Sequence, residues 1–167
     1  MDDTLLDRLN AAGDGLEASR PAVEAGAPWP LAATFDHSDE ARWGPPEVLA
    51  HVAEMLPFWL GEVERILAGD PQPVPFGRVG TDPLRIAIIG RDRSLPIGEL
   101  YIRIHDGLAR WAVRLDTLEP AQLEKVGLHP RLGEMSVEAI IDRQVVRHTS
   151  EHVVQLEALL VGRSPGS

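Results

Sequence analysis

The chain has 167 residues, of which 44% are apolar and 25% are charged, a composition typical of one globular domain with a sizeable core. Its formal net charge of -10 argues against binding to nucleic-acid phosphates or to an anionic membrane surface, because both partners select basic proteins. The lack of cysteine excludes disulfides, thiolate metal ligands and cysteine nucleophiles, and it fits a reducing cytoplasm. We therefore expect a cytoplasmic protein with a small-molecule substrate, and neither nucleic acid nor a membrane as partner.

Apolar residues recur at alternating steps of three and four in four segments, which is the pattern of helices with one buried face. These stripes run through residues 5–23, 48–66, 97–118 and 141–159. The acidic first ten residues do not resemble a secretory signal, and no apolar run approaches the about 18 residues of a membrane span. The four stripes predict four long helices.

Particular residues mark where these helices begin and end. Pro45 and Pro46 suit the first turn of the second helix, and Gly69 suits its end. Ser136 is a good N-cap for the fourth helix. Pro57 falls inside the second helix, so we expect it to kink that helix or to break its hydrogen-bond ladder locally.

The connections between the helices differ in length. Residues 69–94 form a long crossover, in which residues 84–89 suit a short strand or a buried extended segment, and residues 119–133 form a shorter loop. These features predict an all-α four-helix bundle with a long crossover between the second and third helices. We expect a single domain at residues 1–162 and a disordered tail at residues 163–167.

Two histidines, His148 and His152, lie four residues apart on the fourth stripe. Four residues advance a helix by about 6 Å and about 40°, so the two imidazoles can converge on one metal ion. Two adjacent buried imidazoles without partners would be costly, and a shared cation offsets that cost. A single buried histidine is more often a hydrogen-bonded core residue, so both interpretations stay open at this point.

A third ligand has to come from a facing helix, and the candidate is His51, on or next to the inward stripe of the second segment. Three neutral imidazoles with open positions are typical of catalytic zinc sites, because structural sites usually close with four protein ligands. We expect His51, His148 and His152 to bind one divalent ion, zinc or nickel. The catalytic groups themselves are not identified by the sequence.

The order of these histidines resembles the DinB-like (DinB/YfiT-like) superfamily of metal-dependent proteins. The matching stretches are EVLAHVAEM at residues 47–55, residues 82–104, and residues 127–160 around RHTSEH, so the resemblance spans nearly the whole chain. It implies a four-helix bundle with His51 on the second helix and His148 and His152 on the fourth as ligands of one divalent metal. It also implies a homodimer.

The superfamily includes thiol S-transferases that act with bacillithiol, mycothiol or glutathione, and mycothiol-dependent maleylpyruvate isomerases. The resemblance therefore implies a metal-dependent transferase that binds and activates a low-molecular-weight thiol, as a cosubstrate, for S-transfer or isomerisation. The alternative is a non-catalytic, stress-related bundle protein that binds a metal or another ligand. A dedicated polar pocket for the thiol would favour the enzyme.

Other polar residues are candidates for supporting roles. Glu54, three residues after His51, would either orient that imidazole or lie on a solvated helix face. Gln155 would hydrogen-bond a ligand histidine or the substrate. The arginines of the crossover would either cap the mouth of the bundle and hold a carboxylate-bearing thiol or serve as surface charges; they are Arg78, Arg85, Arg91 and Arg93.

The remaining histidines are expected to play no part in the metal site. His37 and His129 lie in predicted loops and should be structural or exposed to solvent. His105 should lie at the edge of the third stripe rather than act as a fourth ligand. The tryptophans are interpreted as packing residues of the core and loops.

Overall fold

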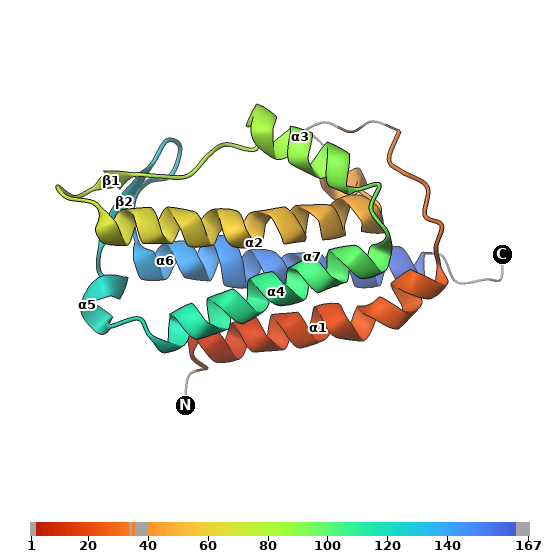
Figure 1. Ribbon diagram of the computed structural model, residues 1–167, viewed down its shortest axis with the longest axis horizontal. Coiled ribbons are helices and arrows are strands. Elements are labelled where there is room, and N and C mark those ends of the chain that lie inside the picture. The colour runs from red at the N-terminus through yellow and green to blue at the C-terminus, as the bar shows by residue number, and fades with distance from the viewer. Residues whose placement is uncertain (1–2, 34, 36–39, 163–167) are drawn as a thin grey trace.

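Residues 3–33, 35 and 40–162 are described in a computed structural model, and they are mostly helical (Figure 1). The helical elements are α1 (Leu5–Ala25), η1 (Glu40–Arg42), α2 (Pro45–Ala68), α3 (Pro83–Asp92), α4 (Ile97–Asp116), α5 (Pro120–Leu123), α6 (Val137–Ile141), η2 (Asp142–Arg147) and α7 (His148–Val161). Three short strands form one sheet: β1 (Val74–Pro75), β2 (Val126–His129) and β3 (Gly133–Ser136). The prediction of a mainly helical protein is confirmed, and the small sheet was not predicted.

The long helices lie lengthwise beside one another, and α3 lies on the outer side of α2 (Figure 1). Helix α4 contacts both α1 and α2, and α7 also contacts both α1 and α2. Their facing sides bury one hydrophobic core, to which α2 contributes the most residues. In α1, the predicted stripe is buried at each position from Leu9 to Val23. Burial of such stripes is the main stabilising term of a helical domain.

The predicted ends of the second and fourth helices agree with the structure. Pro45 and Pro46 occupy the first turn of α2, and Gly69 is its C-cap. The Ser136 hydroxyl accepts a hydrogen bond from the N–H of Ala139 and caps α6. Helix α2 runs from Pro45 to Ala68 and includes Pro57, which has no N–H to donate, so the hydrogen-bond ladder lacks one bond there and the helix nevertheless continues.

The fourth predicted helix is interrupted by η2, a π-helical segment between α6 and α7. A π turn takes one residue more than an α turn. The fully buried positions Ile141, Val145 and Thr149 are accordingly four residues apart. In a regular helix the step after Val145 would be three residues, and residue 148 would be buried instead. His148 is therefore displaced from the core to its edge, with 28% of its side chain exposed.

The crossover between α2 and α4 corrects one prediction. Residues 84–89 are neither strand nor extended but part of α3. Asp82 caps this helix by accepting a hydrogen bond from the N–H of Arg85, and Pro83 follows in the first turn.

The predicted loop at residues 119–133 contains α5 and β2 and leads into β3. Strand β2 pairs with β1 in parallel and with β3 in antiparallel orientation. This sheet lies at one end of the long helices (Figure 1). Within the described ranges, no helix has the length and apolar character needed to cross a membrane. The predicted tail at residues 163–167 lies outside those ranges.

Candidate metal centre

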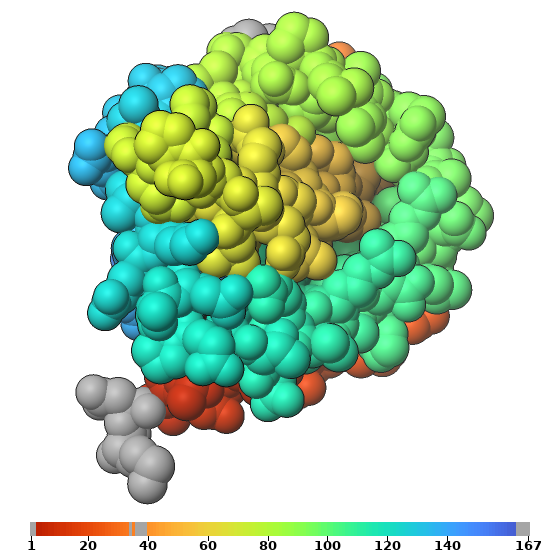
Figure 2. Space-filling view, turned by 60° about the vertical axis from the view of Figure 1, so that its left-hand side comes forward, coloured from red at the N-terminus to blue at the C-terminus, as the bar shows by residue number. Residues whose placement is uncertain are grey.

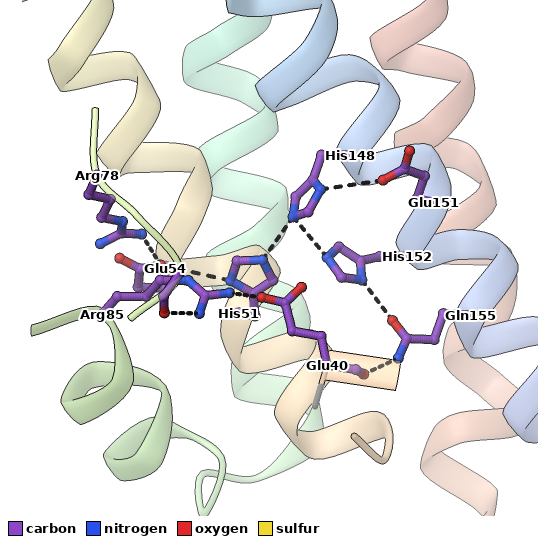
Figure 3. Close-up of polar contacts among 10 residues, drawn as sticks. Glu40, His51, Glu54, Arg78, Arg85, His148, Glu151, His152 and Gln155 are labelled. Carbon is purple, nitrogen blue, oxygen red and sulfur yellow. Dashed lines mark hydrogen bonds and ion pairs between the residues drawn. The ribbon is translucent and has the colours of Figure 1, made fainter. Parts of the chain in front are cut away.

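Three imidazoles from two helices meet at one point between α2 and α7 (Figure 3). His51 lies on α2, and His148 and His152 lie one turn apart at the start of α7. The Nε2 atom of His148 is 3.0 Å from Nε2 of His51 and 3.2 Å from Nε2 of His152. The structure thus brings together all three histidines that the sequence analysis selected as ligands.

Hydrogen bonding alone does not account for this convergence. An imidazole nitrogen carries either one hydrogen or one lone pair, so Nε2 of His148 cannot form good hydrogen bonds with both neighbours. Two nitrogens at about 2.0–2.1 Å from one zinc ion are about 2.9 Å apart in octahedral and about 3.3 Å apart in tetrahedral geometry. The distances of 3.0 and 3.2 Å fall in that interval. The donor set therefore fits a divalent metal ion.

The tautomer of His152 is fixed by a chain of two hydrogen bonds. The side-chain nitrogen of Gln155 donates to the backbone carbonyl of Glu40 at 2.7 Å, which orients the amide. The amide oxygen, 2.9 Å from Nδ1 of His152, can only accept, so Nδ1 carries the proton. The lone pair of the neutral ring is then on Nε2 and is directed at the other two histidines. Gln155 has the contact to a ligand histidine that the sequence analysis suggested.

The other two imidazoles are held less firmly on their outer side. Nδ1 of His148 is 3.4 Å from a carboxylate oxygen of Glu151, which is largely exposed. Nδ1 of His51 is 3.9 Å from Glu54 and has no hydrogen-bond partner among the described residues. Glu54 is buried, so the alternative of a solvated face is wrong. Its carboxylate accepts a hydrogen bond from Arg78 at 2.6 Å and does not directly orient His51.

Burial keeps all three imidazoles neutral at pH 7. Desolvation lowers the pKa of His51 well below its ordinary value, and the neighbouring histidines act in the same direction. Desolvation also lowers the pKa of His148. The pKa of His152 falls to about 4, first through desolvation and then through His148. Neutral rings offer the lone pairs that a metal ion needs.

Glu40 is a fourth group at this centre, and the sequence analysis missed it. Its carboxylate and one nitrogen of each histidine all lie within 4.8 Å of one another. Glu40 belongs to the short turn η1 before α2, and it pairs with the buried guanidinium of Arg85. No helical periodicity covers this turn, so no signal in the sequence marked Glu40 as a neighbour of the histidines.

A pocket of about 190 Å³ opens onto His51 and His148, and Glu40, Arg78 and Arg85 also line it. Two of the four arginines considered as pocket residues are therefore at the centre.

The other two arginines lie elsewhere. Arg91 is largely exposed and pairs with Asp92. Arg93 pairs with the fully buried Glu47 and donates to the carbonyl of Ala32. A role in the pocket is thus wrong for these two: Arg91 is a surface charge, which is the alternative left open by the sequence, and Arg93 is structural.

The remaining histidines and tryptophans largely follow the sequence analysis. His105 is exposed and does not belong to the cluster formed by Glu40 and the three histidines. His129 is a buried structural residue bonded to the Arg78 carbonyl at 3.2 Å. His37 lies outside the described residues. Trp43 and Trp111 are fully buried, and the ring centre of Trp43 is 5.7 Å from that of His51.

In comparisons with known proteins, no family model matches the chain, and no curated protein matches it either. The chemistry of this site is therefore argued from its own residues.

Proposed function

We propose that the chain is a DinB-like four-helix-bundle protein in which His51, His148 and His152 bind one divalent ion, zinc or nickel. The observation that carries this proposal is the convergence of three Nε2 atoms, with contacts of 3.0 and 3.2 Å, at the wall of an open pocket. The function we propose is that of a metal-dependent transferase that activates a low-molecular-weight thiol of the mycothiol or bacillithiol class for S-transfer or isomerisation. We also expect the homodimer that the resemblance implies.

A bound divalent ion would lower the pKa of a thiol at its open position and so supply a thiolate at neutral pH without a protein cysteine. The chain's own residues prepare this chemistry. Gln155 holds the His152 ring with its lone pair toward the centre. The wall formed by Trp43 and the buried helix faces excludes water from the inner side, which strengthens electrostatic interactions there.

A second function is favoured by one observation, the position of Glu40. A carboxylate within 4.8 Å of the three histidine nitrogens can complete a set of four protein ligands. Closed sets of four are typical of structural zinc sites, whereas catalytic sites keep one position open. With Glu40 bound, the protein would be a non-catalytic metal-binding bundle, which is the alternative that the sequence also allows.

Metal analysis of the protein purified without added metal tests the site, and thiol-conjugation assays then test the transferase. We expect one divalent ion per chain and its loss in the double variant His148→Ala, His152→Ala. The variant His105→Ala is the control, because this exposed histidine does not belong to the cluster. Unchanged stoichiometry in the double variant would refute the site. A stable metal site that no thiol perturbs would favour the non-catalytic function.

A further inference from the structure

The backbone around Arg78 is fixed on both sides. The N–H of Gly77 donates to the carboxylate of Glu62, and the carbonyl of Arg78 lies 3.2 Å from Nε2 of His129. Nδ1 of His129 accepts hydrogen bonds from two backbone N–H groups, so Nε2 carries the proton and donates to that carbonyl. Gly77 has a φ of 82°, and a Cβ there would clash with the His129 ring. The segment therefore holds Arg78 in one place.

The Arg78 side chain is also fixed by its neighbours, and some of its N–H groups are not used in hydrogen bonds. Its guanidinium carbon lies 3.7 Å from the ring centre of Phe58, and Nη2 donates to Glu54 at 2.6 Å. Only 9% of the side chain is exposed. Among the described residues, neither Nη1 nor Nε of Arg78 has a hydrogen-bond partner. A buried, stacked guanidinium with unused N–H groups is suited to bind an anion.

Arg78 stands where two hollows of the surface meet. It lines the pocket of about 190 Å³ at the histidines, and it also lines a groove of about 820 Å³. The groove runs along α2 between α3 and α4, and its floor is visible between these two helices in Figure 2. Pockets of about 300–1,000 Å³ suit small organic ligands. Arg78 therefore forms part of the wall of both hollows, and a ligand in either one can reach its guanidinium.

The charges around the pocket favour an anionic ligand. Arg85 is paired with Glu40, and Arg78 with Glu54, and imidazoles bind a metal ion in their neutral form. These two pairs sum to zero, and the carboxylate of Glu151 beside His148 is largely exposed to solvent, so a divalent ion would leave positive charge that the buried groups do not compensate. Burial of uncompensated charge is costly, so the site should prefer a ligand that brings negative charge. Arg85 already donates to Glu40 and to the carbonyl of Gly80, which leaves Arg78 as the better anion donor.

We propose that the molecule bound at this centre carries an acidic group close to its metal-binding atom, and that Arg78 binds this group at the junction of pocket and groove. The inference rests on the metal-bound thiol of the proposed function, but not on the mycothiol or bacillithiol class named there: it selects an acidic thiol, with a carboxylate a few bonds from the sulfur. Arg78 is a substrate-binding residue in this arrangement, and His129, Gly77 and Glu62 position it.

The test uses the full chain loaded with cobalt(II) and follows the sulfur-to-cobalt charge-transfer absorption during titration with small thiols. The probes are 2-mercaptoethanol, which is neutral, and mercaptoacetate and 3-mercaptopropionate, which are acidic. The carboxylate of an acidic thiol can also chelate the cobalt ion or be attracted by its charge, so a preference for the acids is assigned to Arg78 only to the extent that substitution of Arg78 removes it. We expect at least one acid to bind about tenfold tighter, the scale of a charge-assisted hydrogen bond.

The variant Arg78→Gln should weaken binding of that acid about tenfold more than it weakens binding of 2-mercaptoethanol. Arg78→Lys should retain part of the preference, and it keeps the charge if the glutamine variant fails to fold. Arg91→Gln is the matched control, because this arginine is exposed and distant from the pocket. Equal affinities for acidic and neutral thiols, or a preference that Arg78→Gln leaves unchanged, would overturn the inference while leaving the proposed function intact. Absence of the absorption band with every thiol would overturn the proposed function and this inference with it.

Discussion

Replacement of Gln155 by methionine should weaken zinc binding by about 10–100-fold, or about 1.4–2.8 kcal/mol, although Gln155 is not a metal ligand. Methionine has a similar length but provides neither the acceptor for Nδ1 of His152 at 2.9 Å nor the donor to the Glu40 carbonyl at 2.7 Å. Without that acceptor, the neutral ring is free to place its hydrogen on Nε2, where it blocks the lone pair directed at the metal. The buried Nδ1–H also loses its partner in the metal-bound form.

A second substitution separates the two contacts of Gln155. Gln155→Glu keeps an oxygen acceptor for Nδ1 of His152 but removes the donor to the Glu40 carbonyl. If the tautomer of His152 is the main effect, this variant should bind zinc more tightly than Gln155→Met. A higher zinc affinity in Gln155→Glu would show that Gln155 acts through the tautomer of His152. Equally weak zinc binding in both variants would show that it acts through the turn that carries Glu40.

Zinc affinity is measured by competition with a chromophoric chelator, and thermal unfolding of the metal-free variants checks that they fold. Glu157→Gln, an exposed position on the same helix, is the control. An affinity of Gln155→Met within twofold of the unsubstituted protein would refute the reasoning, since the chain of two hydrogen bonds would then have no influence on the ligand.

Three further predictions follow from the same geometry. Single substitution of His148 or His152 by alanine should remove the metal, measured as stoichiometry by elemental analysis, whereas His105→Ala should retain it. The metal-free protein should lose stability as the pH falls from 6.5 toward 4, because His152, with a folded pKa of about 4, stays neutral while the unfolded chain takes up a proton. A shift from 6.5 to about 4 corresponds to about 3 kcal/mol, fully present above pH 6.5, and denaturant titrations across this range measure it. Gly77→Ala should destabilise the fold by about 1–3 kcal/mol, since φ is 82° and the new Cβ meets the His129 ring; an unchanged unfolding midpoint would contradict this.

The elements that the sequence predicts well are those in which local pattern and tertiary packing agree. The α1 stripe from Leu9 to Val23 is buried as its spacing indicates, because this helix packs on α4 and α7 along its length. Helix α3 was misinterpreted because its apolar residues 84–89 were weighed above the start signal of Asp82 and Pro83. The β2–β3 hairpin depends on pairing with β1, some fifty residues away, and no local pattern reports such a contact.

The site was predictable in part for similar reasons. An i, i+4 pair of histidines is a local signal, and His51 lies on a strongly patterned helix. The exposure of His148 was not predictable, because it follows from the extra residue of η2 and from Thr149 taking the buried position. Glu40 lies in a turn of three residues, and only the packing of that turn against α7 brings it to the histidines.

The π-helical segment and the hydrogen-bond chain through Gln155 together explain how buried helix faces can present three imidazoles to a pocket. In a regular helix, His148 would replace Thr149 in the core, and its Nε2 would have no path to solvent. The segment η2 moves the His148 ring to the pocket wall. Thr149 takes the core position instead, and its hydroxyl donates a hydrogen bond to the Val145 carbonyl at 2.6 Å. His152 remains buried, and its orientation is set by an amide that also binds the turn of Glu40. Because one side chain ties that turn to a ligand ring, a change at either should be felt at the other, and metal binding should order both.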